Sequence, residues 1–77
     1  LMDQLILLRL EAYRRIRDRC ISEINAKVNR ILESIAAGDL ENQAIIRQEI
    51  ESLRIPEAEL SRVVQDLEEL YASQFGD

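Results

Sequence analysis

The sequence predicts an all-α protein built as a helical hairpin, and three observations support this fold class. Apolar residues recur at helical spacing along the 77-residue chain, and strand-like alternation is absent. Helix breakers are sparse, with two glycines and one proline. Gly38 and Pro56 divide the chain into one long arm and a return arm of similar length. We therefore expect a single helical domain over residues 1–77.

The first predicted helix covers residues 3–37 and carries an apolar seam along one face. The seam advances by about 3.6 residues per turn, which is the period of a straight helix. Gly38 suits the left-handed residue that closes a helix, and Asp39 suits the N-cap of the next one. The expected seam residues are Ile6, Leu10, Tyr13, Cys20, Ile24, Val28, Ile31 and Ile35.

The return arm is predicted to be broken at Pro56, which gives helices over residues 40–54 and 57–74. Proline lacks an amide hydrogen and disfavours the helical conformation of Ile55, so the helix is expected to kink or break there. In a hairpin, the two shorter helices follow each other along the first helix. In the alternative, the third helix folds back into a compact three-helix bundle, and another chain must then cover the overhanging first helix.

The residue types argue against catalysis and against bound metals. The chain has no histidine, so it lacks the commonest general base and the commonest metal ligand. It has no glycine-rich phosphate loop and a single cysteine, Cys20, which lies among aliphatic residues and is expected to be a buried, inert thiol. We expect a protein that is not an enzyme and that uses no cofactor and no metal.

A second apolar stripe on the first helix indicates a contact with another protein. Its residues follow each other at helical spacing, on a face away from the seam, and two arginines continue it as a polar rim. A helix that is apolar on several sides is normally covered on several sides, so we expect self-association into a dimeric or higher helical bundle, or docking on a helical partner. The expected contact residues are Leu1, Leu5, Leu8, Ala12, Arg15 and Arg19. In the alternative, Leu70, Tyr71 and Phe75 cover the stripe within the chain.

The net charge of −5 is divided unevenly along the chain. Residues 1–30 hold seven basic and four acidic side chains, whereas residues 31–77 hold three basic and eleven acidic ones. The simplest interpretation is that a basic arm lies against an acidic one, with Arg9, Arg17 and Lys27 either extending to solvent or pairing with Glu49 or Glu57. The alternative is an RNA- or DNA-binding dimer that uses Arg14, Arg15 and Arg19.

Two short segments resemble known families. Leu5-Ile6-Leu7-Leu8-Arg9 resembles the start of the first helix in the all-helical chorismate mutases, which implies a dimeric enzyme, but the later arginine and lysine spacing departs from that family. Residues 69–77 are similar to the tail of plasmid-encoded Rop-type RNA regulators, which are dimeric helical hairpins, although the first helix here is much longer. Neither likeness assigns a functional residue to this chain.

No membrane segment is expected. The apolar run at the start of the sequence ends at Arg9, well below the ~20 residues that cross a bilayer. No basic leader precedes that run, because the only charge before Leu5 is Asp3. The sequence therefore favours a cytoplasmic protein.

Overall fold

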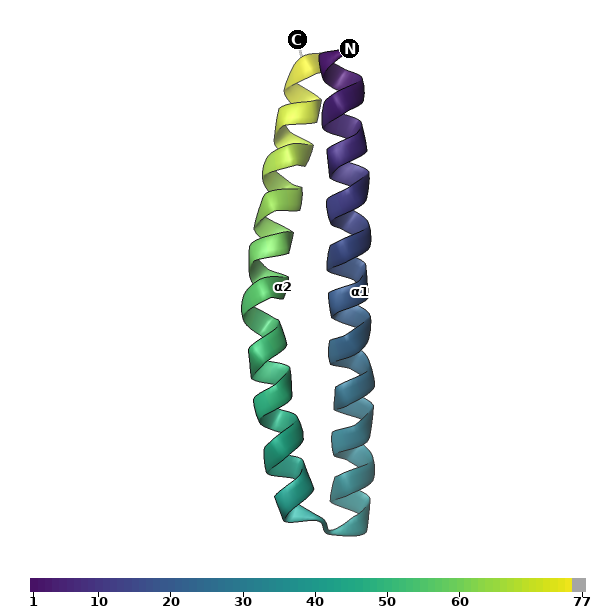
Figure 1. Cartoon of the computed structure of the whole chain (residues 1–77), viewed down its shortest axis with the longest axis vertical. Coiled ribbons are helices and arrows are strands. Elements are labelled where there is room, and N and C mark those ends of the chain that lie inside the picture. The colour runs from purple at the N-terminus through teal and green to yellow at the C-terminus, as the bar shows by residue number, and fades with distance from the viewer. Residues whose placement is uncertain (76–77) are drawn as a thin grey trace.

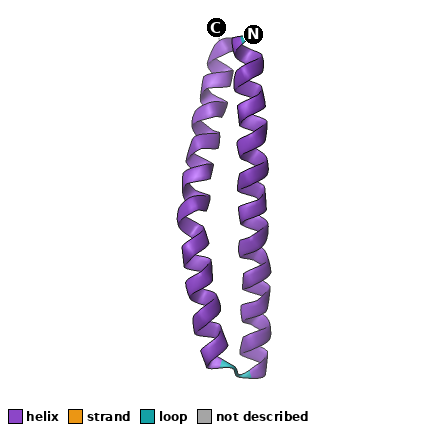
Figure 2. Cartoon of the chain, in the orientation of Figure 1, coloured by secondary structure: helices purple, strands orange, loops and turns teal. Residues whose placement is uncertain are grey.

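Two long antiparallel helices make up the fold in the computed structural model, which describes residues 1–75 (Figure 1). Helix α1 runs over Met2–Ala37 and helix α2 over Leu40–Phe75, and each has 36 residues. A short turn joins them, and α1 begins at the same end of the rod where α2 ends (Figure 2). The rod measures 56 × 17 × 14 Å. We call the end with the turn the loop end and the opposite end the open end.

The turn between the helices forms as predicted around Gly38 and Asp39. Gly38 has φ 70° and ψ 21°, a left-handed conformation that glycine adopts without steric cost. The amides of Gly38 and Asp39 donate to the carbonyls of Ile35 (3.1 Å) and Ser34 (3.0 Å), which satisfies the end of α1. Asp39 Oδ1 accepts a hydrogen bond from the Asn42 amide at 3.0 Å and so caps the start of α2.

The seam between the helices follows a 3.5-residue repeat, so the predicted 3.6-residue period was wrong. Its positions alternate in steps of three and four, the spacing of a coiled coil, and each is buried or half-buried. The corrected spacing places Ser34 in the seam and leaves Ile35 and Val28 52% and 41% exposed. In α1 the seam is Ile6, Leu10, Tyr13, Arg17, Cys20, Ile24, Lys27, Ile31 and Ser34. In α2 it is Gln43, Ile46, Ile50, Leu53, Glu57, Leu60, Val64, Leu67 and Tyr71.

Helix α2 continues through Pro56, so the predicted break into helices over 40–54 and 57–74 was wrong. The seam of α2 keeps its spacing from Leu53 to Glu57 and Leu60, on both sides of the proline. Packing of these residues along α1 outweighs the local cost of proline, which is ~3 kcal/mol in a helix interior. The proline is accompanied by a bend, since α2 bows away from α1 over its middle (Figure 1).

Full burial is confined to the two ends of the rod. Ile6, Leu10 and Val64 are buried toward the open end, and Ser34, Ile46 and Ile50 are buried toward the loop end. Between these clusters, no described residue of either helix is fully buried. Neither helix of the described chain is long and apolar enough to cross a membrane.

Candidate functional site

The predicted contact stripe lies open on α1 at the open end. Leu1, Leu5 and Leu8 are 94%, 57% and 62% exposed, while Ala12 is half-buried. The described residues of α2 therefore do not cover the stripe, and Leu70 is itself 47% exposed. The side chain of Phe75, which the sequence offered as part of an internal cover, lies outside the described residues. Three large aliphatic side chains on one outer face make a surface that favours an apolar partner.

The three arginines of the predicted nucleic-acid surface do not share one environment. Arg15 and Arg19 are exposed and continue the line of the stripe. Arg14 is half-buried, and its Nη2 donates to Glu68 Oε2 on α2 at 2.9 Å. This ion pair connects the basic arm to the acidic arm and directs Arg14 toward α2, so only Arg15 and Arg19 point outward together.

Lys27 and Glu49 form a cross-helix ion pair, which is one of the two arrangements that the sequence left open for Lys27. Lys27 Nζ donates to Glu49 Oε2 at 2.6 Å, and Arg30 Nη1 lies 4.0 Å from the same oxygen. The hydrogen bond and charge of Lys27, with a smaller contribution from Arg30, hold the pKa of Glu49 below its ordinary value of 4.5. Both side chains keep access to solvent, so the pair sets helix register more than it stabilises the fold.

The other polar seam residues at mid-rod stay within reach of water. Arg17 bends out of the seam and donates from Nε and Nη2 to Asp18 Oδ1 at 3.2 and 3.1 Å, rather than pairing with Glu57. Cys20 is half-buried, and its Sγ donates to the Leu53 carbonyl at 3.5 Å. The guanidinium of Arg17 leaves water only at high cost, so this residue keeps the middle of the seam in contact with water.

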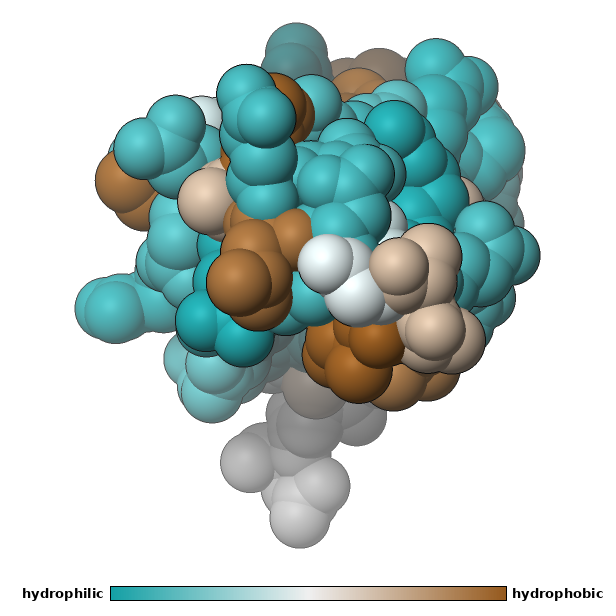
Figure 3. Space-filling view, turned by 90° about the horizontal axis from the view of Figure 1, so that it is seen from below, coloured by the Kyte–Doolittle hydropathy of each residue, from teal (hydrophilic) through white to brown (hydrophobic). Residues whose placement is uncertain are grey.

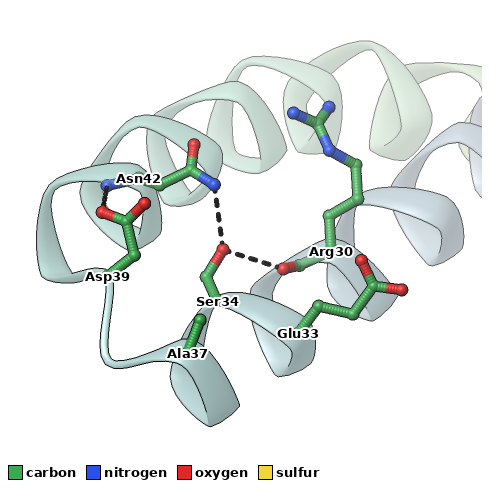
Figure 4. Close-up of a pocket in the computed structure, with 6 residues that line it drawn as sticks. All are labelled: Arg30, Glu33, Ser34, Ala37, Asp39 and Asn42. Carbon is green, nitrogen blue, oxygen red and sulfur yellow. Dashed lines mark hydrogen bonds between the residues drawn. The ribbon is translucent and has the colours of Figure 1, made fainter.

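A polar network at the loop end has a structural role (Figure 4). Asn42 Nδ2 donates to Ser34 Oγ at 3.0 Å, and Ser34 Oγ donates to the Arg30 carbonyl at 3.0 Å. Together with the Asp39 cap, these bonds link the last turn of α1 to the first turn of α2 across an open depression of about 220 Å³. The network ties the two helices together where the chain reverses.

The loop end also exposes aliphatic side chains, of which Leu32 and Leu40 were not singled out from the sequence and Ile35 was expected in the seam. Viewed from that end, apolar atoms emerge between hydrophilic ones (Figure 3). Leu32, Ile35 and Leu40 are 58%, 52% and 76% exposed. These three residues are not seam positions, and the seven-residue repeat was the signal that could have separated them from the core.

One flank of the rod contains an apolar groove that sequence reasoning missed. Two open depressions of about 560 and 420 Å³ adjoin there, because Arg54 lines both. Helix α1 supplies an aliphatic floor and α2 a mostly charged wall. The floor is Ile21, Ile24, Val28 and Ile31, and the wall includes Arg47, Glu51, Arg54, Glu57 and Ala58. Finding the groove requires the register of the two helices, which one sequence alone does not reveal.

Within the described residues, no group of three or more histidine, cysteine, aspartate or glutamate side chains is placed to hold a metal ion. The chain matches no protein-family profile, no curated protein and no solved structure. The residues and their geometry therefore carry the functional proposals that follow.

Proposed function

We propose that this protein is a non-enzymatic interaction or assembly module that docks on an apolar helical surface through Leu1, Leu5, Leu8 and Ala12. The observation that carries the proposal is the exposure of Leu1, Leu5 and Leu8, each above half of its surface, on one outer face of α1. Covering such side chains is favourable, because burial of apolar area contributes about 25 cal/mol of free energy per Å². Arg15 and Arg19 border the stripe and suit the polar rim of an interface.

The proposed partners are helical proteins, a further copy of this chain among them. A straight stripe on a rod-shaped hairpin fits another helix along its length, and such packing would build a dimeric or higher helical bundle. We propose the cytoplasm as the place of action, since Cys20 is the only cysteine and no disulfide supports the fold.

The test replaces Leu5 and Leu8 by aspartate together. We expect Leu5→Asp/Leu8→Asp to lower the assembly state in sedimentation velocity at tens of micromolar, or to abolish binding to a helical partner, with helicity retained in circular dichroism. The matched control is Ala26→Asp/Asn29→Asp, which adds the same charges at equivalent exposed repeat positions farther along α1. Equal behaviour of the two double variants would contradict the proposal.

A further inference from the structure

The groove at mid-rod lies on a different face from the stripe, and its floor is aliphatic throughout. Ile21, Val28 and Ile35 recur every seven residues along α1 beside the seam residues Ile24 and Ile31, so the apolar surface of α1 is broader here than the seam itself. Helix α2 covers this broader surface only in part, since Val28 and Ile35 stay 41% and 52% exposed. A helix whose apolar face is wider than one seam is typical of a bundle with more than two helices.

The wall of the groove carries charges of alternating sign. Arg47, Glu51, Arg54 and Glu57 all line it, so its order along α2 is positive, negative, positive, negative. Read in the opposite direction, the same wall is negative, positive, negative, positive. The wall is therefore complementary to itself when a second copy runs antiparallel to the first.

We propose that the groove binds a second copy of this chain in antiparallel orientation, which forms a four-helix bundle. Arg54 Nη1 and Glu51 Oε1 lie 3.3 Å apart within one chain, and in the dimer each of these charges also meets the opposite charge of the other copy, while Arg47 meets Glu57. A two-fold arrangement of this kind uses one patch twice, as closed homodimers do. A partner helix with one sign of charge would meet like charges at half of the wall positions, which disfavours it.

The floor of the groove fits the same two-fold axis. Lys27 pairs with Glu49, and Cys20 contacts the Leu53 carbonyl. The midpoint between Glu51 and Arg54 on α2 therefore lies level with the part of α1 between Cys20 and Lys27. Ile21 and Val28 flank that level on either side. A half-turn about it stacks Ile21 of one copy on Val28 of the other, so apolar side chains meet while the wall charges pair.

This contact leaves the stripe free. The centre of the groove is nearer to the loop end than to the open end, so the first turns of α1, Leu5 and Leu8 among them, extend beyond the second copy. The inference goes beyond the proposed function, because it assigns a different surface to self-association.

The test exchanges the wall charges in two variants of the full chain. Arg47→Glu/Arg54→Glu makes the wall uniformly negative, and Glu51→Arg/Glu57→Arg makes it uniformly positive. In sedimentation equilibrium we expect a wild-type dimer, at least tenfold weaker self-association of each variant, and recovery of the dimer when the two variants are mixed in equal amounts. The control Arg9→Glu/Arg62→Glu changes the net charge as the first variant does but lies outside the groove lining, and it should dimerise like the wild type.

Several results would overturn the inference. These are a monomeric wild type at hundreds of micromolar, variants that each still dimerise, or a mixture of helical variants, checked by circular dichroism, that stays monomeric. Leu5→Asp/Leu8→Asp separates this inference from the proposed function, because that change should remove association through the stripe, in larger assemblies or with another helical protein, and leave the groove dimer in place. If that variant abolished dimerisation while the charge exchanges did not, the stripe would be the self-association surface and the groove would not.

Discussion

The ends and the middle of the rod are built from the same two helices, yet they pack differently. At the ends, the seam holds aliphatic side chains such as Leu10, Ile46 and Val64, which are 2%, 0% and 1% exposed. In the middle, the same repeat positions hold Arg17 and Lys27, and no described residue there is fully buried. Charged residues at seam positions keep water in contact with the helices, so the same seven-residue repeat gives a buried core in one region and a seam that stays accessible to water in the other.

The largest expected effect comes from cutting a core residue at the loop end. Ile46→Ala removes a fully buried side chain and should lower the free energy of unfolding by about 3 kcal/mol, through lost burial and the cavity left behind. Ile24→Ala removes the same atoms from a half-buried mid-rod position and should cost about 1 kcal/mol. Urea unfolding followed by circular dichroism measures both. Equal losses would break the distinction between end and middle.

Replacing the proline should stabilise the middle of the rod relative to its ends. Pro56→Ala restores a backbone hydrogen-bond donor and relieves a cost of ~3 kcal/mol in a helix interior, offset by up to about 1 kcal/mol because the unfolded chain becomes freer. We expect a gain of about 2 kcal/mol in the free energy of unfolding. Ile55→Ala, at a neighbouring position that is 68% exposed, serves as the control and should change little. A Pro56→Ala variant no more stable than the wild type would mean that the bend carries no cost.

The smallest expected effect is on the stability of the fold at acidic pH. Because the folded-state pKa of Glu49 lies below its ordinary value of 4.5, the Lys27–Glu49 pair contributes stability above that value and loses it as the pH falls through the folded-state pKa. Carboxyl-resolved NMR titration should place the Glu49 pKa below 4.5. Lys27→Met should raise this pKa toward 4.5 and flatten the acid dependence of stability, and Lys27→Arg should preserve both. An unshifted Glu49 in the wild type would contradict the pairing.

Local chemistry made part of the fold predictable. Gly38 and Asp39 specify the turn through a left-handed residue and an N-cap, and both act within a few residues of themselves. Pro56 misled the prediction because its local cost was weighed without the seam that holds α2 together on both sides. The repeat was misread because only apolar residues were counted, whereas Arg17, Lys27 and Ser34 occupy seam positions and complete the 3.5-residue spacing.

Of the two candidate surfaces, one could be predicted from the sequence and the other could not. The open stripe around Leu5 and Leu8 follows from spacing within a single helix, so the sequence was sufficient to place it on an outer face of α1. The groove needs Arg54 of one helix beside Ile24 of the other, and only the register between the helices brings them together. Contacts between segments far apart in sequence are the part that local periodicity cannot supply.

The position of the two chain ends gives the rod a mechanical property. Helix α1 begins and α2 ends at the same end, while the turn lies at the far end of a body 56 Å long (Figure 1). A rod of this shape holds its two ends apart by about its own length. Whatever is held near Leu40 at the turn is carried about the length of the rod away from whatever is held near Leu5, and the two antiparallel helices resist bending together more than either would alone. The length of the rod, and with it the distance between Leu5 and Leu40, depends on the number of turns in the two helices.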